Sequence, residues 1–130
     1  MIAQQFEDLI VWQQARILTK EIYAITKLPE FSRDFRFVGQ ITAATGSIMD
    51  NIAEGFERDG RKEFLNFLSI AKGSCGEVRS QLHRAYDVGY IDKETHDRLV
   101  GLTLSNGRSI YGLMKTLQVS EFEGLKRKRT

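Results

Sequence analysis

The side chains best placed to do chemistry in this sequence are basic groups on one flank of a predicted helix. At the helical advance of 100° per residue they fall within about 40° of one another. The four residues are Arg61, Lys72, Arg79 and His83. Glu63 and Glu77 fall on the far side of the same segment. A stripe of one charge along a helix is the pattern expected for phosphate contacts, so these residues are candidate nucleic-acid ligands. The alternative is a flank that is solvated or paired with a neighbouring helix.

A second basic cluster closes the sequence. Lys126, Arg127, Lys128 and Arg129 follow a stretch with no clear apolar periodicity, and residues 119–130 are therefore predicted to form a basic C-terminal tail. The tail is a further candidate for contact with nucleic acid.

Patterns that would indicate catalysis or metal binding are not found. Carboxylate-bridged metal sites in helical bundles use Glu-x-x-His pairs, but Ser80 and Lys93 stand three residues before His83 and His96. Cys75 falls on an apolar seam and is expected to be a buried, inert thiol. We therefore expect no enzyme activity, no metal and no cofactor.

The bulk composition is that of one folded domain. The chain has 130 residues, of which 42% are hydrophobic and 28% charged, and its formal net charge is +2. With so small a net charge, any binding of nucleic acid must rest on local clusters. One cysteine permits no intrachain disulfide, and we find neither a leader peptide nor an apolar run long enough to span a bilayer. The sequence predicts a cytoplasmic protein that does not insert into membranes.

Four long segments position these groups. They cover approximately residues 7–27, 32–55, 60–89 and 92–117, and in each of them apolar residues recur every three or four positions. Pro29, Gly55 and Gly89 are expected to end the first three helices, with Ser32 and Asp92 as N-caps. Short connections make successive helices antiparallel neighbours. The prediction is an all-α, up-down four-helix bundle over residues 1–118.

The apolar seams predict the core. In the first two segments they consist of Val11, Ala15, Leu18, Ile22 and Ile25, and of Val38, Ile41, Thr45, Ile48 and Ile52. In the last two they consist of Phe64, Leu68, Ala71, Cys75, Val78, Leu82 and Ala85, and of Leu99, Leu102, Asn106, Ile110, Leu113 and Leu117. Asn106 is the weak member of the fourth seam.

The second segment has no charged residue between Phe37 and Met49. Its positions off the seam are small or weakly polar, and such residues let another backbone approach closely. They are Gly39, Thr42, Ala43, Gly46 and Ser47. A helix on the surface of a monomer normally has a polar face. We interpret these positions as a candidate oligomer interface; the alternative is a helix held deep within its own bundle.

A distinctive stretch follows this face. Glu54 and Arg58 are four residues apart, and Asn51 and Glu54 have side chains that can accept hydrogen bonds from backbone N–H groups. Asn51, Glu54, Gly55 and Arg58 are therefore expected to lock a structural turn, with contact to a ligand as the alternative.

The chain also resembles a known family in four ordered motifs. The first two are Asp8-Leu9-Ile10-Val11-Trp12-Gln13-Gln14-Ala15 and Ser47-Ile48-Met49-Asp50-Asn51-Ile52-Ala53-Glu54-Gly55. The third combines Lys62-Glu63-Phe64 with Phe67-Leu68-Ser69-Ile70-Ala71-Lys72-Gly73-Ser74, and the fourth runs from Leu82 to Ile91. They resemble the bacterial proteins encoded in intervening sequences of 23S ribosomal RNA genes, over about residues 6–117.

The resemblance implies a four-helix bundle and a cyclic homo-oligomer, usually a pentamer. A more distant similarity is to accessory proteins of diversity-generating retroelements, which bind nucleic acid and a reverse transcriptase through a basic surface. This sequence departs from the family pattern at Ala43, Met49 and Cys75, where the family often has a basic residue, proline and leucine. Losing the charge at Ala43 lowers the positive potential expected on that helix.

Two functions follow from these observations. The first is an oligomeric, non-enzymatic module that binds structured RNA or DNA through the basic stripe. The second is a protein-interaction scaffold with no nucleic-acid partner.

Overall fold

The computed structural model describes residues 3–58 and 60–129, with side chains from 3 to 58 and from 60 to 119. Its elements are a 3-10 turn η1 (Phe6–Asp8) and the helices α1 (Ile10–Ile25), α2 (Pro29–Arg33), α3 (Phe35–Glu57), α4 (Arg61–Asp87) and α5 (Lys93–Arg129). No strand occurs within these ranges. The predicted all-α class is confirmed.

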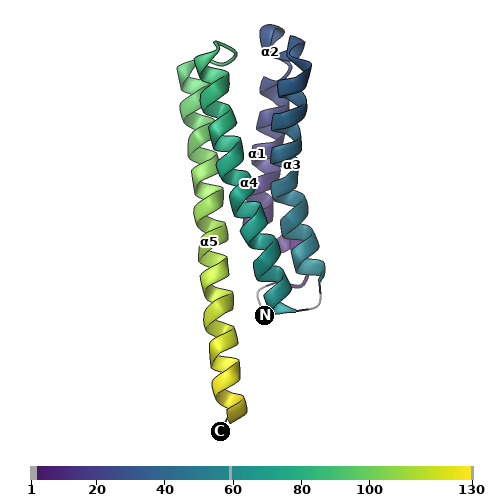
Figure 1. Ribbon diagram of the computed structural model, residues 1–130, viewed down its shortest axis with the longest axis vertical. Helices are drawn as coiled ribbons and strands as arrows, with labels where there is room; N and C mark the ends of the chain where they lie inside the picture. The colour runs from purple at the N-terminus through teal and green to yellow at the C-terminus, as the bar shows by residue number, and fades with distance from the viewer. Residues whose placement is uncertain (1–2, 59, 130) are drawn as a thin grey trace.

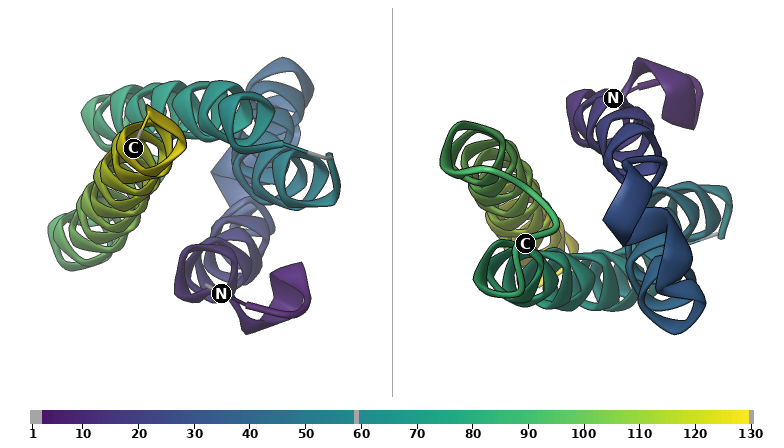
Figure 2. Two further views of the ribbon diagram at one scale, coloured as in Figure 1. Left: turned by 90° about the horizontal axis from the view of Figure 1, so that it is seen from below. Right: turned by 90° about the horizontal axis from the view of Figure 1, so that it is seen from above.

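The four long helices α1, α3, α4 and α5 lie side by side, and each runs opposite to the long helix before it (Figure 1). Helices α3 and α5 each pack against both α1 and α4. Figure 2 shows the four helices from both ends. Helix α5 extends well beyond the lower end of the others, so its last turns lie away from them (Figure 1).

Burial follows the predicted seams closely. Leu18, Ile48, Leu82 and Ile110, one from each long helix, have no exposed surface. Val38, Leu102 and Leu113 are the exceptions, because they are only half-buried at the margin of the core. The three- and four-residue spacing therefore predicts most of the core. The buried hydrophobic residues that belong to no predicted seam are Leu9, Phe31, Phe37, Ala44 and Ile91.

The connection between α1 and α3 differs from the prediction. Pro29 does not only end the preceding helix; it occupies the first turn of the extra helix α2, where its missing N–H costs no hydrogen bond. Ser32 lies inside α2 and is not the cap of α3. Asp34 has that role, because its Oδ1 accepts a hydrogen bond from the Phe37 N–H at 3.1 Å. Phe31 of α2 is fully buried.

The connection from α3 to α4 differs from the prediction, whereas the connection from α4 to α5 agrees with it. Helix α3 continues past Gly55 to Glu57, so Gly55 is not its C-cap. The turn after α4 is as predicted: Gly89 has a φ of +83°, which favours glycine, and the Asp92 carboxylate accepts a hydrogen bond from the Thr95 N–H at 2.8 Å.

Helix α5 is continuous in its backbone to Arg129 and so crosses the predicted boundary at residue 118. The side chains of Lys126, Arg127, Lys128 and Arg129 lie outside the described residues. The division into residues 1–118 and a basic tail at 119–130 stays a prediction. None of the described helices is both long and apolar enough to cross a membrane.

Candidate nucleic-acid interface

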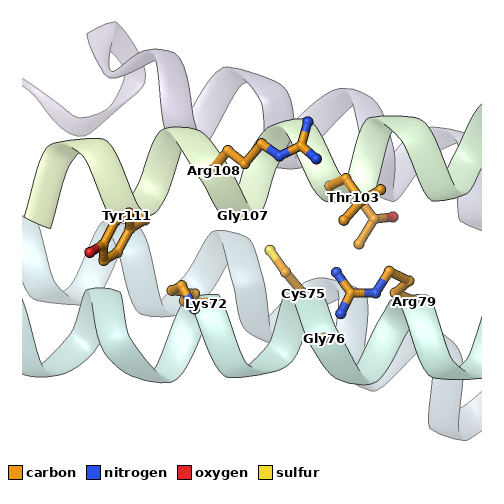
Figure 3. A pocket seen from close by; sticks show the side chains of 9 residues that line it. Lys72, Cys75, Gly76, Arg79, Thr103, Gly107, Arg108 and Tyr111 are labelled. Carbon is orange, nitrogen blue, oxygen red and sulfur yellow. The ribbon is translucent and has the colours of Figure 1, made fainter.

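A groove between α4 and α5 collects basic side chains (Figure 3). We call it the basic groove. It has a volume of about 270 Å³ and is lined by Lys72, Cys75, Gly76 and Arg79 from α4 and by Thr103, Leu104, Gly107, Arg108 and Tyr111 from α5. The small residues Gly76 of α4 and Gly107 of α5 line the groove (Figure 3), and a Cβ at Gly107 would lie 3.7 Å from Cys75 Cβ.

In the described part of the chain, three cations and no carboxylate line the basic groove. Lys72 and Arg79 come from the predicted stripe, and Arg108 comes from the opposite helix. Among the described residues, none of the three forms an ion pair. The groove therefore carries an uncompensated positive potential, which attracts phosphate groups.

An aromatic ring lies at one end of the groove. Tyr111 is half exposed, and the Nζ atoms of Lys72 and Lys115 lie 5.8 and 5.4 Å from its ring centroid. These are cation–π distances, so the phenol ring helps to hold both ammonium groups over α5. An exposed ring beside cations is also a surface on which a nucleic-acid base can stack.

The floor of the groove is inert. Burial raises the pKa of the Cys75 thiol to about 11, although the positive charges of Lys72 and Arg79 act in the opposite direction. The thiol is therefore protonated at neutral pH, as expected for a cysteine on an apolar seam. Its Sγ lies 3.9 Å from Oδ1 of the buried Asn106.

The other two residues of the predicted basic stripe, Arg61 and His83, do not line the groove. Arg61 is exposed at the first position of α4 and does not line the groove. His83 also lies outside it, because its Nδ1 is 2.9 Å from Nε2 of His96. The structure thus brings together Lys72 and Arg79 of the predicted set. Arg108 and Tyr111 were missed, because no single-helix pattern shows which side chains of α5 come to lie beside α4.

The small residues of α3 are divided between two environments. Gly39 and Ala43 are exposed, and a Cβ at Gly39 or Gly46 would meet no atom within 4 Å. Thr42 is half-buried and donates its hydroxyl to the Val38 carbonyl oxygen at 2.7 Å. Ser47 instead lies beside α4, since its Oγ is 3.1 Å from Oγ of Ser74.

Most of the residues predicted to lock a structural turn lie within the last two helical turns of α3. Asn51 does not accept bonds from loop N–H groups as expected; its Nδ2 donates to the Ser47 carbonyl oxygen and to Ser47 Oγ, both at 2.8 Å. Arg58 directly follows the helix and lies 3.7 Å from carboxylate oxygens of both Glu54 and Glu63. It therefore joins the end of α3 to the start of α4.

Gly55 has a packing role. It is buried, and a Cβ at this position would lie 2.6 Å from Phe67 Cβ and 3.2 Å from Phe64 Cδ1. Only glycine allows α4 to approach α3 this closely.

No group of three or more His, Cys, Asp or Glu side chains in the described ranges is arranged to hold a metal ion. The basic groove has the chemistry of an anion-binding surface and offers no nucleophile with an adjacent base.

Comparison with known proteins agrees with the four sequence motifs. The family model described as 23S rRNA-intervening sequence protein matches residues 7–112. A crystal structure of a protein of unknown function, from the S23 ribosomal protein family of Bacteroides thetaiotaomicron, is similar to this chain with a TM-score of 0.76. The two are 22% identical, and the match covers 82% of this chain and 99% of the other. At that identity the likeness shows the fold alone. No curated protein matches the chain.

Proposed function

This chain belongs to the family of 23S rRNA-intervening sequence proteins, and from that premise we propose that it is an oligomeric, non-enzymatic module that binds structured RNA or DNA through the basic groove. The observation that supports this most directly is that Lys72, Arg79 and Arg108 line one groove, with no carboxylate among its described lining residues. Cations without ion-pair partners can neutralise phosphates and so release the counterions condensed on the nucleic acid, and this release drives binding.

The test is fluorescence anisotropy with a labelled RNA hairpin and a DNA duplex, titrated at several salt concentrations. We expect affinity to fall steeply with salt, because each neutralised phosphate adds about 0.9 to the slope of log K against log salt for duplex DNA. Replacing Lys72, Arg79 and Arg108 together with glutamine is expected to lower that slope by about 2 to 3 and to weaken binding at least about tenfold.

A matched control removes the same number of charges from exposed sites away from the groove. The control residues are Lys20, Lys27 and Arg33. If this variant lost as much affinity as the groove variant, binding would depend on total charge and the groove would have no special role. Equal affinity of the groove variant and the unmodified chain would contradict the proposal.

A protein-interaction scaffold is the second candidate, and exposed apolar side chains favour it. Phe35 is 84% exposed, and Ile10 and Ile17 of α1 are 66% and 56% exposed. Exposed rings and branched chains of this size are typical of contact surfaces. Failure to bind either nucleic acid at low salt, together with capture of one defined protein from nuclease-treated lysate, would favour the scaffold.

We further propose that the four long helices form an antiparallel up-down bundle that assembles into a cyclic homo-oligomer, a pentamer by family resemblance, through the outer face of α3. Phe35, Gly39, Thr42 and Gly46 fall on one side of that helix, and none of them is charged. The open space above Gly39 and Gly46 would admit a neighbouring backbone.

Replacing Gly46 with glutamate is expected to release folded single chains, because it places a charge where two backbones would meet. Light scattering measures the mass, and circular dichroism checks that the helices persist. The matched control is Gly73→Glu on the exposed side of α4, where a Cβ also meets no atom within 4 Å. An unchanged mass for Gly46→Glu would place the interface elsewhere.

A further inference from the structure

The chain contains only two histidines, and the fold brings them together. His83 lies in the last turns of α4 and His96 in the first turn of α5, 13 positions apart in the sequence. Nδ1 of His83 is 2.9 Å from Nε2 of His96, and the ring centroids are 5.0 Å apart. Two ring nitrogens from different helices therefore face one another at the end of the α4–α5 pair.

The surroundings hold the His96 ring in position. The Tyr86 ring lies with its centroid 4.9 Å from that of His96, and the His96 side chain is only 14% exposed. The start of α5 is fixed by the Asp92 cap, and the His96 N–H also donates to the Asp92 carbonyl oxygen at 2.9 Å. His83 is exposed, so its ring can tilt towards a ligand between the two.

Asp97 determines which nitrogen of His96 carries the proton. Its Oδ1 lies 2.8 Å from His96 Nδ1, and its Oδ2 accepts a hydrogen bond from Lys93 Nζ at 2.6 Å. A carboxylate oxygen accepts hydrogen bonds and has no proton to donate, so the proton between His96 and Asp97 is on Nδ1 of His96. The lone pair of Nε2 then points towards His83.

A histidine whose second nitrogen donates to a carboxylate is the arrangement commonly found around bound metals. Metal–imidazole bonds of about 2.0–2.1 Å that meet at 90–110° place their nitrogens about 2.8–3.4 Å apart. The observed 2.9 Å is a hydrogen-bond distance that also lies within this range.

We propose that Nδ1 of His83 and Nε2 of His96 bind a divalent transition-metal ion of the type that prefers imidazole, such as Ni²⁺, Cu²⁺ or Zn²⁺, and so link α4 to α5. Without metal, Nδ1–H of His83 donates to Nε2 of His96. Metal binding at Nδ1 of His83 requires this proton to move through water to Nε2 of the same ring, so no net proton is released. Water fills the remaining coordination positions. Asp97 and Tyr86 act as positioning residues that orient the His96 ring.

The experiment is a titration of Ni²⁺ into the chelator-treated full chain, prepared without a histidine tag and followed by isothermal calorimetry at about pH 7.5, where free imidazole is mostly neutral. We expect one Ni²⁺ per chain. Each of His83→Gln and His96→Gln is expected to lower the affinity more than tenfold. Asp97→Asn keeps both imidazoles and is expected to weaken binding by about 10- to 100-fold.

The control Asp50→Asn removes an equal charge from the exposed side of α3 and is expected to bind like the unmodified chain. Circular dichroism checks that each variant remains helical. As a second measurement, Ni²⁺ should raise the melting temperature of the unmodified chain and of Asp50→Asn, but not of the histidine variants. Unchanged affinity in either histidine variant, or no binding of Ni²⁺ by the unmodified chain, would overturn the proposal.

Discussion

Replacing Asn106 with aspartate is expected to destabilise the protein by about 3 kcal/mol or more at neutral pH, because the change buries a charge that has no ion-pair partner. Asn106 is 1% exposed, and its Nδ2 donates to the Val11 carbonyl oxygen at 3.0 Å and to Gln14 Oε1 at 3.3 Å. A carboxylate of the same shape has no N–H to donate and places its charge against the Val11 carbonyl oxygen.

The loss should depend on pH in a defined direction. Burial raises the pKa of the introduced carboxyl in the folded state above its value in the unfolded chain. Stability of the variant relative to the unmodified protein is therefore highest below the unfolded pKa and falls as pH rises through the folded pKa. Urea unfolding of both proteins at about pH 4.5 and 7.5 measures this difference.

The control for Asn106→Asp is Asn66→Asp on the exposed side of α4, which is expected to change stability by no more than about 0.5 kcal/mol. A loss of under about 1 kcal/mol for Asn106→Asp, equal at both pH values, would show that the buried amide contributes little to joining α5 to α1.

Helical periodicity was enough to locate most of the core. Leu18, Ile48 and Leu82 could be assigned from spacing alone, because a helix that buries one face repeats its apolar residues at three and four positions. The same reasoning ranked Asn106 as the weakest seam residue. Polarity alone could not show that α1 supplies hydrogen-bond acceptors for its amide.

The predicted helix end at Gly55 and the predicted cap at Ser32 were wrong, because contacts with other elements decide the structure at both positions. Glycine is common at helix ends, yet Gly55 lies inside α3. A glycine is needed there because α4 passes close to its backbone. Ser32 is a good cap by type, but Pro29 starts a short helix before it and Asp34 becomes the cap. Local propensity is a weak predictor at such positions, since packing against other elements decides the outcome.

In the candidate sites, too, contacts between two helices could not be predicted from the pattern of one helix. Lys72 and Arg79 lie on one helix, so their shared flank follows from the angle per residue alone. Arg108, Tyr111 and the pairing of His83 with His96 depend on how α5 is placed beside α4. That placement is set by the turn at Gly89 and by core packing, and neither specifies a register in a single sequence.

Replacing Gly55 with alanine is expected to destabilise the protein by about 2 kcal/mol, although alanine is the better helix former by up to about 1 kcal/mol. The new Cβ would lie 2.6 Å from Phe67 Cβ, an atom fixed to the backbone of α4, so the two helices must separate. Contacts of Phe64 with α3 would be loosened at the same time. Urea unfolding followed by circular dichroism measures the change in free energy.

The matched variant Gly73→Ala should have the opposite sign. Gly73 lies inside α4 on an exposed side, where a Cβ would meet no atom within 4 Å, so only the gain in helix propensity of about 0.5–1 kcal/mol remains. If both alanine variants were stabilised equally, α4 could move away from α3 without cost, and the close approach at Gly55 would not be a requirement of the fold. Opposite signs would show that the glycine at position 55 is retained for packing, because the same substitution in the same secondary structure differs only in what the new methyl group meets.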